Sequence, residues 1–133
     1  MSLAPYSSGN PETAKYVIIG EYPGAEEEQR GGAFIGAAGR LLDDLLRNAG
    51  IARDEVYFDN VFQFRPAGND LSPYIKFAKT VTETEHFIKA QSSLAARIDT
   101  TKANVILTLG NVPTYALTGL TPITKQRGSV VPS

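Results

Sequence analysis

The chain has 133 residues, enough for one soluble globular domain with a buried core, and its formal net charge is −1. It contains no Cys, which excludes disulfides, thiolate nucleophiles and cysteine-ligated zinc or iron–sulfur clusters. The single His, His86, excludes a poly-His metal centre. Neither a membrane-spanning apolar run nor a secretory signal is recognisable, so we expect a cytoplasmic protein that does not interact with membranes.

Charge is distributed unevenly between the two halves of the chain. Residues 1–63 carry 5 Lys and Arg against 10 Asp and Glu, whereas residues 64–133 carry 8 Lys and Arg against 4 Asp and Glu. This asymmetry permits a basic face that binds nucleic acid, and it is equally compatible with ordinary solvated surface.

The N-terminal third of the chain predicts a leader, a strand and a long loop. Residues 1–14 are rich in Ser, Gly, Asn and Pro and predict a flexible leader ahead of a single domain over residues 15–133. Residues 15–20 are mostly apolar and rich in β-branched side chains, which predicts a buried strand. The Gly-rich stretch 20–39 predicts a loop, and loops of this length in a compact domain are usually functional.

Two helices follow from the spacing of apolar residues. Apolar side chains at helical spacing over residues 41–49 predict an amphipathic helix that packs on a sheet and ends at Gly50. A second helix is predicted over about residues 80–98, and Thr82 and Glu85 have the spacing of a capping box at its start.

Further buried strands are predicted at residues 56–61 and 105–110, and another is expected near residues 130–131. A short helix is predicted from Asn111 to Leu117. Buried strands that alternate with helices in this way predict an α/β fold, a three-layer α/β/α sandwich with a central, mainly parallel sheet.

Three segments are expected to meet at one edge of this sheet, because parallel sheets bind ligands beyond the carboxyl ends of their strands. They are the turn at residues 20–24, Asn60 and the turn at residues 110–111. The sequence lacks the Gly-Lys-Ser/Thr ending of a P-loop and the third glycine of a dinucleotide fingerprint, which disfavours both kinds of phosphate site.

Residues at this edge each have a functional and a structural interpretation. Glu21 is either a carboxylate that faces a ligand or a solvated residue of a tight turn. Phe34, which has small neighbours, is either a plug that fills the core or a platform on which a ligand stacks. Asn60 either caps a neighbouring loop or presents its amide to a ligand.

Several linked segments resemble the uracil-DNA glycosylase superfamily, and in particular its iron–sulfur-containing, family-four type. The resemblance runs in register from about residue 15 to residue 130, nearly the whole chain. The matching segments are residues 20–27, 32–43, 56–61, 65–69, 105–111 and 123–128.

The resemblance implies a pocket for a base that has been flipped out of DNA. It implies that Glu21 is the catalytic carboxylate beside the reacting sugar, that Phe34 stacks on the base and that Asn60 pairs with the edge of the base. It also implies further substrate-binding residues, Gly20, Tyr22, Pro23 and Gly24, and candidate DNA contacts, Asn111, Lys125 and Arg127.

Three departures from the family pattern bear on activity. The four cluster-ligating Cys are absent and Phe64 stands in the place of one, so we expect no cofactor, with apolar packing in place of the cluster. Tyr22 stands where relatives carry a small residue or an Asp, and its ring is expected to narrow or fill the pocket. The family's last, His-containing motif is missing, and His86 is in the wrong context to replace it.

These departures lead to three hypotheses. The first, which the departures favour, is a uracil-DNA glycosylase-like domain that binds DNA with reduced or no activity. It would be part of a longer chain, such as the N-terminal domain of a phage DNA polymerase, and would act in the host cytoplasm. The second is an active uracil-DNA glycosylase of base-excision repair, whose partner is uracil-containing DNA. The third is an unrelated α/β nucleotide-binding domain.

Overall fold

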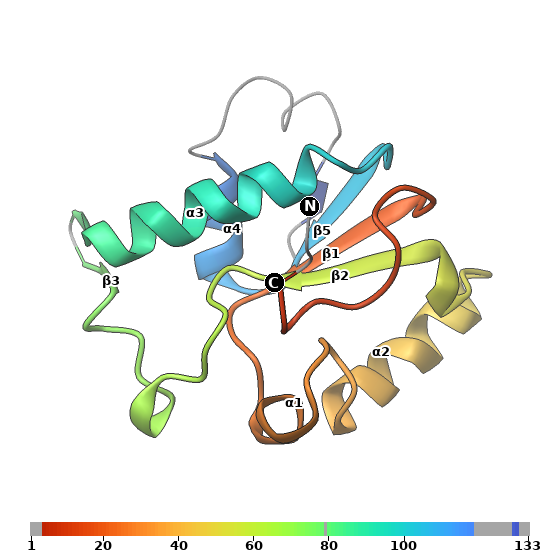
Figure 1. The fold of residues 1–133 in the computed structure, drawn as a ribbon, viewed down its shortest axis with the longest axis horizontal. Coiled ribbons are helices and arrows are strands. Elements are labelled where there is room, and N and C mark those ends of the chain that lie inside the picture. The colour runs from red at the N-terminus through yellow and green to blue at the C-terminus, as the bar shows by residue number, and fades with distance from the viewer. Residues whose placement is uncertain (1–3, 79, 119–128, 131–133) are drawn as a thin grey trace.

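The computed structural model describes residues 4–78, 80–118 and 129–130. Helices cover both faces of a four-stranded parallel sheet whose strand order is β2-β1-β5-β6 (Figure 1). The strands of this sheet are Tyr16–Gly20 (β1), Val56–Asn60 (β2), Val105–Thr108 (β5) and Ser129–Val130 (β6). The prediction of a three-layer α/β/α sandwich is confirmed.

The remaining elements flank this sheet. The α-helices are Ala25–Arg30 (α1), Ala37–Asn48 (α2), Glu85–Ile98 (α3) and Asn111–Thr118 (α4), and the 3₁₀ helices are Arg53–Glu55 and Ala67–Asn69. Two short strands, Ile75–Phe77 (β3) and Val81–Glu83 (β4), pair antiparallel as a separate hairpin. Within the residues described, no helix is long and apolar enough to cross a membrane.

Alternate residues of β1 face two separate apolar cores, as the pleat of a strand requires. Val17 and Ile19 belong to the larger core, which includes apolar side chains of α3 and α4. Ile18 belongs to the smaller core, on which Leu42 and Leu46 of α2 pack. Because the sheet is covered on both faces, its strands appear in the sequence as continuous apolar runs.

The helix α2 packs with a narrower face than predicted. Leu41 and Leu45 belong to the predicted apolar stripe, but they are 63% and 58% exposed. They lie on the flank of the helix because only Leu42 and Leu46 reach the smaller core. Gly50 ends the helix as predicted, with a φ of 80° that suits glycine.

The N-terminal segment packs against the sheet, which differs from the flexible leader predicted for residues 1–14. Ser8 forms an antiparallel bridge with Phe58, with N···O distances of 2.9 and 2.8 Å. The strand β2 lies at the edge of the sheet, so the bridge pairs backbone groups that would otherwise be open. In its described part, this segment is therefore held by long-range contacts.

Two other predictions are wrong in detail. The predicted loop at residues 20–39 contains α1 and the start of α2. The helix predicted from about residue 80 begins at Glu85, because Thr84 is its N-cap and accepts a hydrogen bond from the N–H of Phe87 at 3.2 Å. Thr82 is therefore not the cap, and it pairs in the β3–β4 hairpin instead.

The register of the sheet brings its functional edge together. Gly20 pairs with Asn60, and Ile19 pairs with Thr108, so β1, β2 and β5 end at the same level. The turn after β1, the end of β2 and the turn before α4 therefore meet at one edge, as predicted. The expected final strand forms at Ser129–Val130, and residue 131 lies outside the described residues.

Candidate functional site

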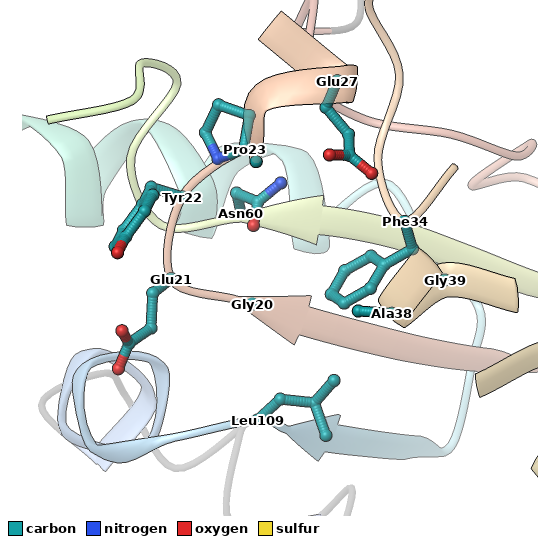
Figure 2. Close-up of a pocket in the computed structure, with 11 residues that line it drawn as sticks. Gly20, Glu21, Tyr22, Pro23, Glu27, Phe34, Ala38, Gly39, Asn60 and Leu109 are labelled. Atoms are coloured by element: carbon teal, nitrogen blue, oxygen red, sulfur yellow. The ribbon is translucent and has the colours of Figure 1, made fainter. Parts of the chain in front are cut away.

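A pocket of about 260 Å³ opens at the carboxyl ends of β1 and β2 (Figure 2). Most of its lining comes from the turn after β1, the loop before α2 with the first turn of that helix, and the end of β2. The helix α1 and the residue after β5 complete it. All seven residues predicted for catalysis or substrate binding line it, namely Gly20, Glu21, Tyr22, Pro23, Gly24, Phe34 and Asn60. The lining also includes four residues that were not predicted, Glu27, Ala38, Gly39 and Leu109.

Phe34 reaches the pocket from an uncommon backbone conformation. Its φ is 56°, in the left-handed region that a bulky residue rarely adopts. Its half-buried ring lies 5.4 Å from the ring of Phe58, measured between centroids. A Cβ at Gly20 would lie only 2.7 Å from the Phe34 ring, so the glycine makes room for it. The ring therefore packs on the smaller core and also lines the pocket.

The backbone after Phe34 is held by a carboxylate that the sequence did not indicate. Glu27 is buried in α1, and its Oε2 accepts hydrogen bonds from the N–H groups of Ile35 and Gly36, each at 2.8 Å. Burial alone raises the pKa of the Glu27 carboxyl. The backbone hydrogen bonds outweigh burial, however, and hold this pKa below its ordinary value. Ionised Glu27 therefore stabilises the loop that carries Phe34.

Acid is expected to weaken this contact. Because folding lowers the pKa of Glu27, its contribution to stability is present above the ordinary pKa of 4.5 and is lost as the pH falls through the folded value. We expect Glu27→Gln to reduce the free energy of unfolding at neutral pH, and this deficit should shrink below about pH 4. Urea denaturation of both proteins across this range measures the deficit, and a deficit that is constant with pH would contradict the expectation.

Arg53 holds the same loop from a different element. Its guanidinium donates to the carbonyl oxygens of Ala33 at 2.7 Å and Phe34 at 2.8 Å, and to Asp43 Oδ1 at 2.8 Å. It also lies 4.3 Å from the centroid of the Phe58 ring, on which Phe34 packs. Such contacts offset the cost of an uncommon φ. The sequence offered no signal for Arg53, because its partners lie 10 to 20 residues away.

Asn60 is buried at the end of β2. Its Nδ2 donates to the carbonyl oxygen of Tyr6 at 3.2 Å. Its Oδ1 lies on the side of Gly20, where a Cβ on that glycine would come within 2.8 Å of it (Figure 2). The amide therefore anchors the N-terminal segment through its nitrogen, while the side chain lines the pocket. That Asn60 presents its amide to a ligand stays a prediction.

Glu21 directly follows β1, and its half-buried carboxylate points toward the turn before α4 (Figure 2). A Cβ at Gly110 would lie 2.7 Å from Glu21 Oε2, and Gly110 has a φ of 106°. This turn therefore needs glycine both for its backbone conformation and for the close approach of the carboxylate.

Tyr22 forms a side wall of the pocket. Its ring packs against the larger core, and its hydroxyl lies 3.4 Å from the carbonyl oxygen of Asn69. The ring does not fill the pocket, since about 260 Å³ remain open.

The predicted DNA contacts lie outside the pocket lining or outside the described residues. Asn111 is exposed at the first position of α4. Lys125 and Arg127 lie in the stretch of residues 119–128, which the structure does not describe.

Comparison with known proteins places this chain in a family. A model of the uracil DNA glycosylase superfamily matches residues 6–133. The chain belongs to this superfamily. It is 33% identical over 125 residues to a Type-4 uracil-DNA glycosylase of Archaeoglobus fulgidus. This alignment covers 90% of this chain and 57% of the relative. It is 37% identical over 130 residues to a Type-4 uracil-DNA glycosylase of Thermotoga maritima, and this alignment covers 92% of this chain and 59% of the relative.

These comparisons confirm the resemblance seen in the sequence. The chain spans less than two thirds of the length of either uracil-DNA glycosylase relative. Neither relative is named as a polymerase or a phage protein, so the link to a phage DNA polymerase stays a prediction.

The residues of this superfamily member do not fit the cysteine-ligated iron–sulfur cluster of family-four enzymes. The chain has no Cys, and the part that the structure describes holds no group of three or more His, Asp or Glu placed to bind a metal. Phe64, which stands in the place of one of the family's cluster-ligating Cys residues, packs against Tyr74 at 5.0 Å and His86 at 5.1 Å between ring centroids. Phe62 joins them at 5.6 Å from Phe64. Aromatic packing therefore surrounds this position, and His86 belongs to it and not to the pocket lining.

Proposed function

We propose that this chain is an active uracil-DNA glycosylase, which hydrolyses the bond between uracil and deoxyribose in DNA. The observation that best supports activity is the single pocket shared by Glu21, Phe34 and Asn60, which come from three separate segments. The relatives matched over most of this chain are named Type-4 uracil-DNA glycosylases. They favour activity over the reduced activity that the departures from the family pattern suggested.

In this proposal, the uracil leaves the DNA stack and enters the pocket from its open side. Phe34 stacks on the face of the base, a contact worth about 1–3 kcal/mol for a base on an aromatic ring. Asn60 forms hydrogen bonds with the edge of the base. Glu27 and Arg53 hold the Phe34 loop before the substrate arrives, so that binding does not have to order it.

The reaction breaks the bond between C1′ of the sugar and N1 of the uracil, and the electron pair leaves with the base. The sugar becomes cationic, and the negative charge of Glu21 stabilises it. Water then adds its oxygen to C1′ and the released proton goes to the uracil. The products are free uracil and DNA with an abasic site. Asn111, Lys125 and Arg127 are the proposed contacts to the DNA around this site.

Strand scission tests the proposal. The protein is incubated with single-stranded and duplex oligonucleotides that contain one uracil, and the abasic sites are then cleaved with alkali. We expect scission at the uracil and none in a matched oligonucleotide with cytosine at that position. Salt-sensitive DNA binding without scission would contradict activity and support a non-catalytic DNA-binding module. The absence of both binding and scission at low salt would contradict a role on DNA.

A further inference from the structure

A buried ion pair lies next to Asn60 in the chain. Asp59 precedes Asn60 in β2, so their side chains point to opposite faces of the sheet. Asp59 is fully buried, and Arg97 of α3 donates to its two oxygens, from Nε at 2.7 Å and from Nη2 at 3.2 Å. The hydroxyl of Tyr57 donates to Asp59 Oδ2 at 2.6 Å. With these donors the carboxylate is fixed in one position.

Hydrogen bonds connect this ion pair to the side chain of Asn60. The N–H of Asn60 donates to Asp59 Oδ1 at 2.7 Å. Gln63 Nε2 donates to the same Oδ1 at 2.9 Å and to the carbonyl oxygen of Asn60 at 3.1 Å. Gln63 Oε1 accepts from the N–H of Tyr6 at 2.8 Å, and the carbonyl oxygen of Tyr6 accepts from Asn60 Nδ2 at 3.2 Å. The connections therefore run from Arg97 to the Asn60 amide.

We propose that Arg97, Asp59 and Gln63 are positioning residues that fix the Asn60 amide with its Oδ1 toward the pocket. Gln63 places the backbone of Tyr6, and the carbonyl oxygen of Tyr6 can pair only with the amide nitrogen of Asn60. A flipped amide would bring two oxygens together and lose this hydrogen bond. The N-terminal segment is thus part of the pocket's support.

This orientation has a consequence for the choice of base. With Oδ1 toward the pocket, Asn60 offers an acceptor to a donor on the edge of the base. Uracil carries an N–H at ring position 3, whereas cytosine has an unprotonated nitrogen there, so the fixed amide favours uracil. The orientation of the Asn60 amide follows from its hydrogen bonds alone, whereas the choice of base rests on the proposed function.

Gln63→Leu is the sharpest test, because Gln63 is half-buried and carries no charge. Replacing Asp59 or Arg97 alone leaves a buried charge without its partner and risks unfolding the protein. Leucine has a similar size, but it can neither donate a hydrogen bond to Asp59 nor accept one from the N–H of Tyr6. The matched control is Gln91→Leu, which removes one hydrogen bond from Gln91 Nε2 in α3 to the carbonyl oxygen of Ala116, at 2.7 Å.

Two measurements on the wild type and both variants test whether Gln63 positions the Asn60 amide. The first is hydrogen exchange of the Asn60 side-chain amide by NMR, which we expect to be faster in Gln63→Leu and unchanged in Gln91→Leu. The second is the single-turnover rate of uracil release. It should fall by about 10- to 100-fold in Gln63→Leu, because a small misplacement of a substrate-positioning group costs about that much. The Gln91→Leu rate should stay close to that of the wild type.

The outcomes separate this inference from the proposed function. If the wild type releases no uracil, the proposed function fails, but faster Asn60 exchange in Gln63→Leu still supports the positioning network. If Gln63→Leu matches Gln91→Leu in both exchange and rate, the network is overturned, whatever the activity of the wild type. If exchange quickens but an active enzyme keeps its rate, the link to base recognition is overturned.

Discussion

Glu21→Gln is expected to lower the single-turnover rate of uracil release by about 10²- to 10³-fold, the usual effect of removing one preorganised electrostatic contact to a transition state. Glutamine keeps the size of the side chain and its place beside Gly110, but it cannot stabilise a cationic sugar by charge. The loss should appear in the rate constant at saturating protein and hardly at all in the affinity for the substrate DNA.

The control for Glu21→Gln is Glu28→Gln. Glu28 is an exposed residue of α1 that does not line the pocket, and its carboxylate lies 3.9 Å from Arg65. Both changes remove one negative charge, so a general effect on DNA affinity appears equally in both variants. A Glu21→Gln protein that keeps the rate of the Glu28→Gln protein would show that Glu21 is not the catalytic carboxylate.

The second large effect is expected on stability. Asp59→Ala should lower the free energy of unfolding by about 3–5 kcal/mol, because it leaves the guanidinium of Arg97 buried without its partner. Denaturation in urea measures the loss. The double variant Asp59→Ala/Arg97→Met should lose less than the single variant, since its apolar side chain no longer buries an unpaired charge.

An exposed ion pair provides the comparison. Asp44 Oδ1 lies 2.7 Å from Arg47 Nη2 on α2, and both side chains are well exposed to solvent. Asp44→Ala should therefore change the free energy of unfolding by no more than about 1 kcal/mol. A loss for Asp59→Ala as small as that for Asp44→Ala would contradict a structural role for the buried pair.

Local signals predicted most of the sheet and the place of the pocket. The buried strands β1, β2 and β5 appear in the sequence as apolar runs because helices cover both faces of the sheet. The order of strands and helices then implied which ends of the strands meet. Glu21, Phe34 and Asn60 could therefore be placed at one edge, although their roles came only from the resemblance.

Long-range contacts explain what the sequence did not reveal. Glu27 looks like one of several acidic residues at the start of a surface helix, yet it is buried under the Phe34 loop. Arg97 can lie on the buried side of α3 because it pairs with Asp59, and this partner is 38 residues away in the sequence. The segment before β1 appears flexible until its pairing with Phe58 is known. No local propensity encodes such pairs.

The helix boundaries were wrong where two local signals compete. Val81 fits the apolar stripe of the predicted helix, and Thr82 has the spacing of a helix cap, but both residues are β-branched and favour a strand. The hairpin with β3 decides in favour of the strand, and Thr84 then caps the helix through Phe87. In the Gly-rich loop, glycines on both sides concealed the short helix α1.

Direct detection of free uracil tests the central claim most simply. The 133-residue chain is mixed in excess with a single-stranded oligonucleotide that contains one uracil, and the released base is quantified by chromatography. We predict release of one uracil per oligonucleotide, and no base from the same oligonucleotide with cytosine. An oligonucleotide that is bound by the protein but keeps its uracil would contradict the claim that this chain is an active glycosylase.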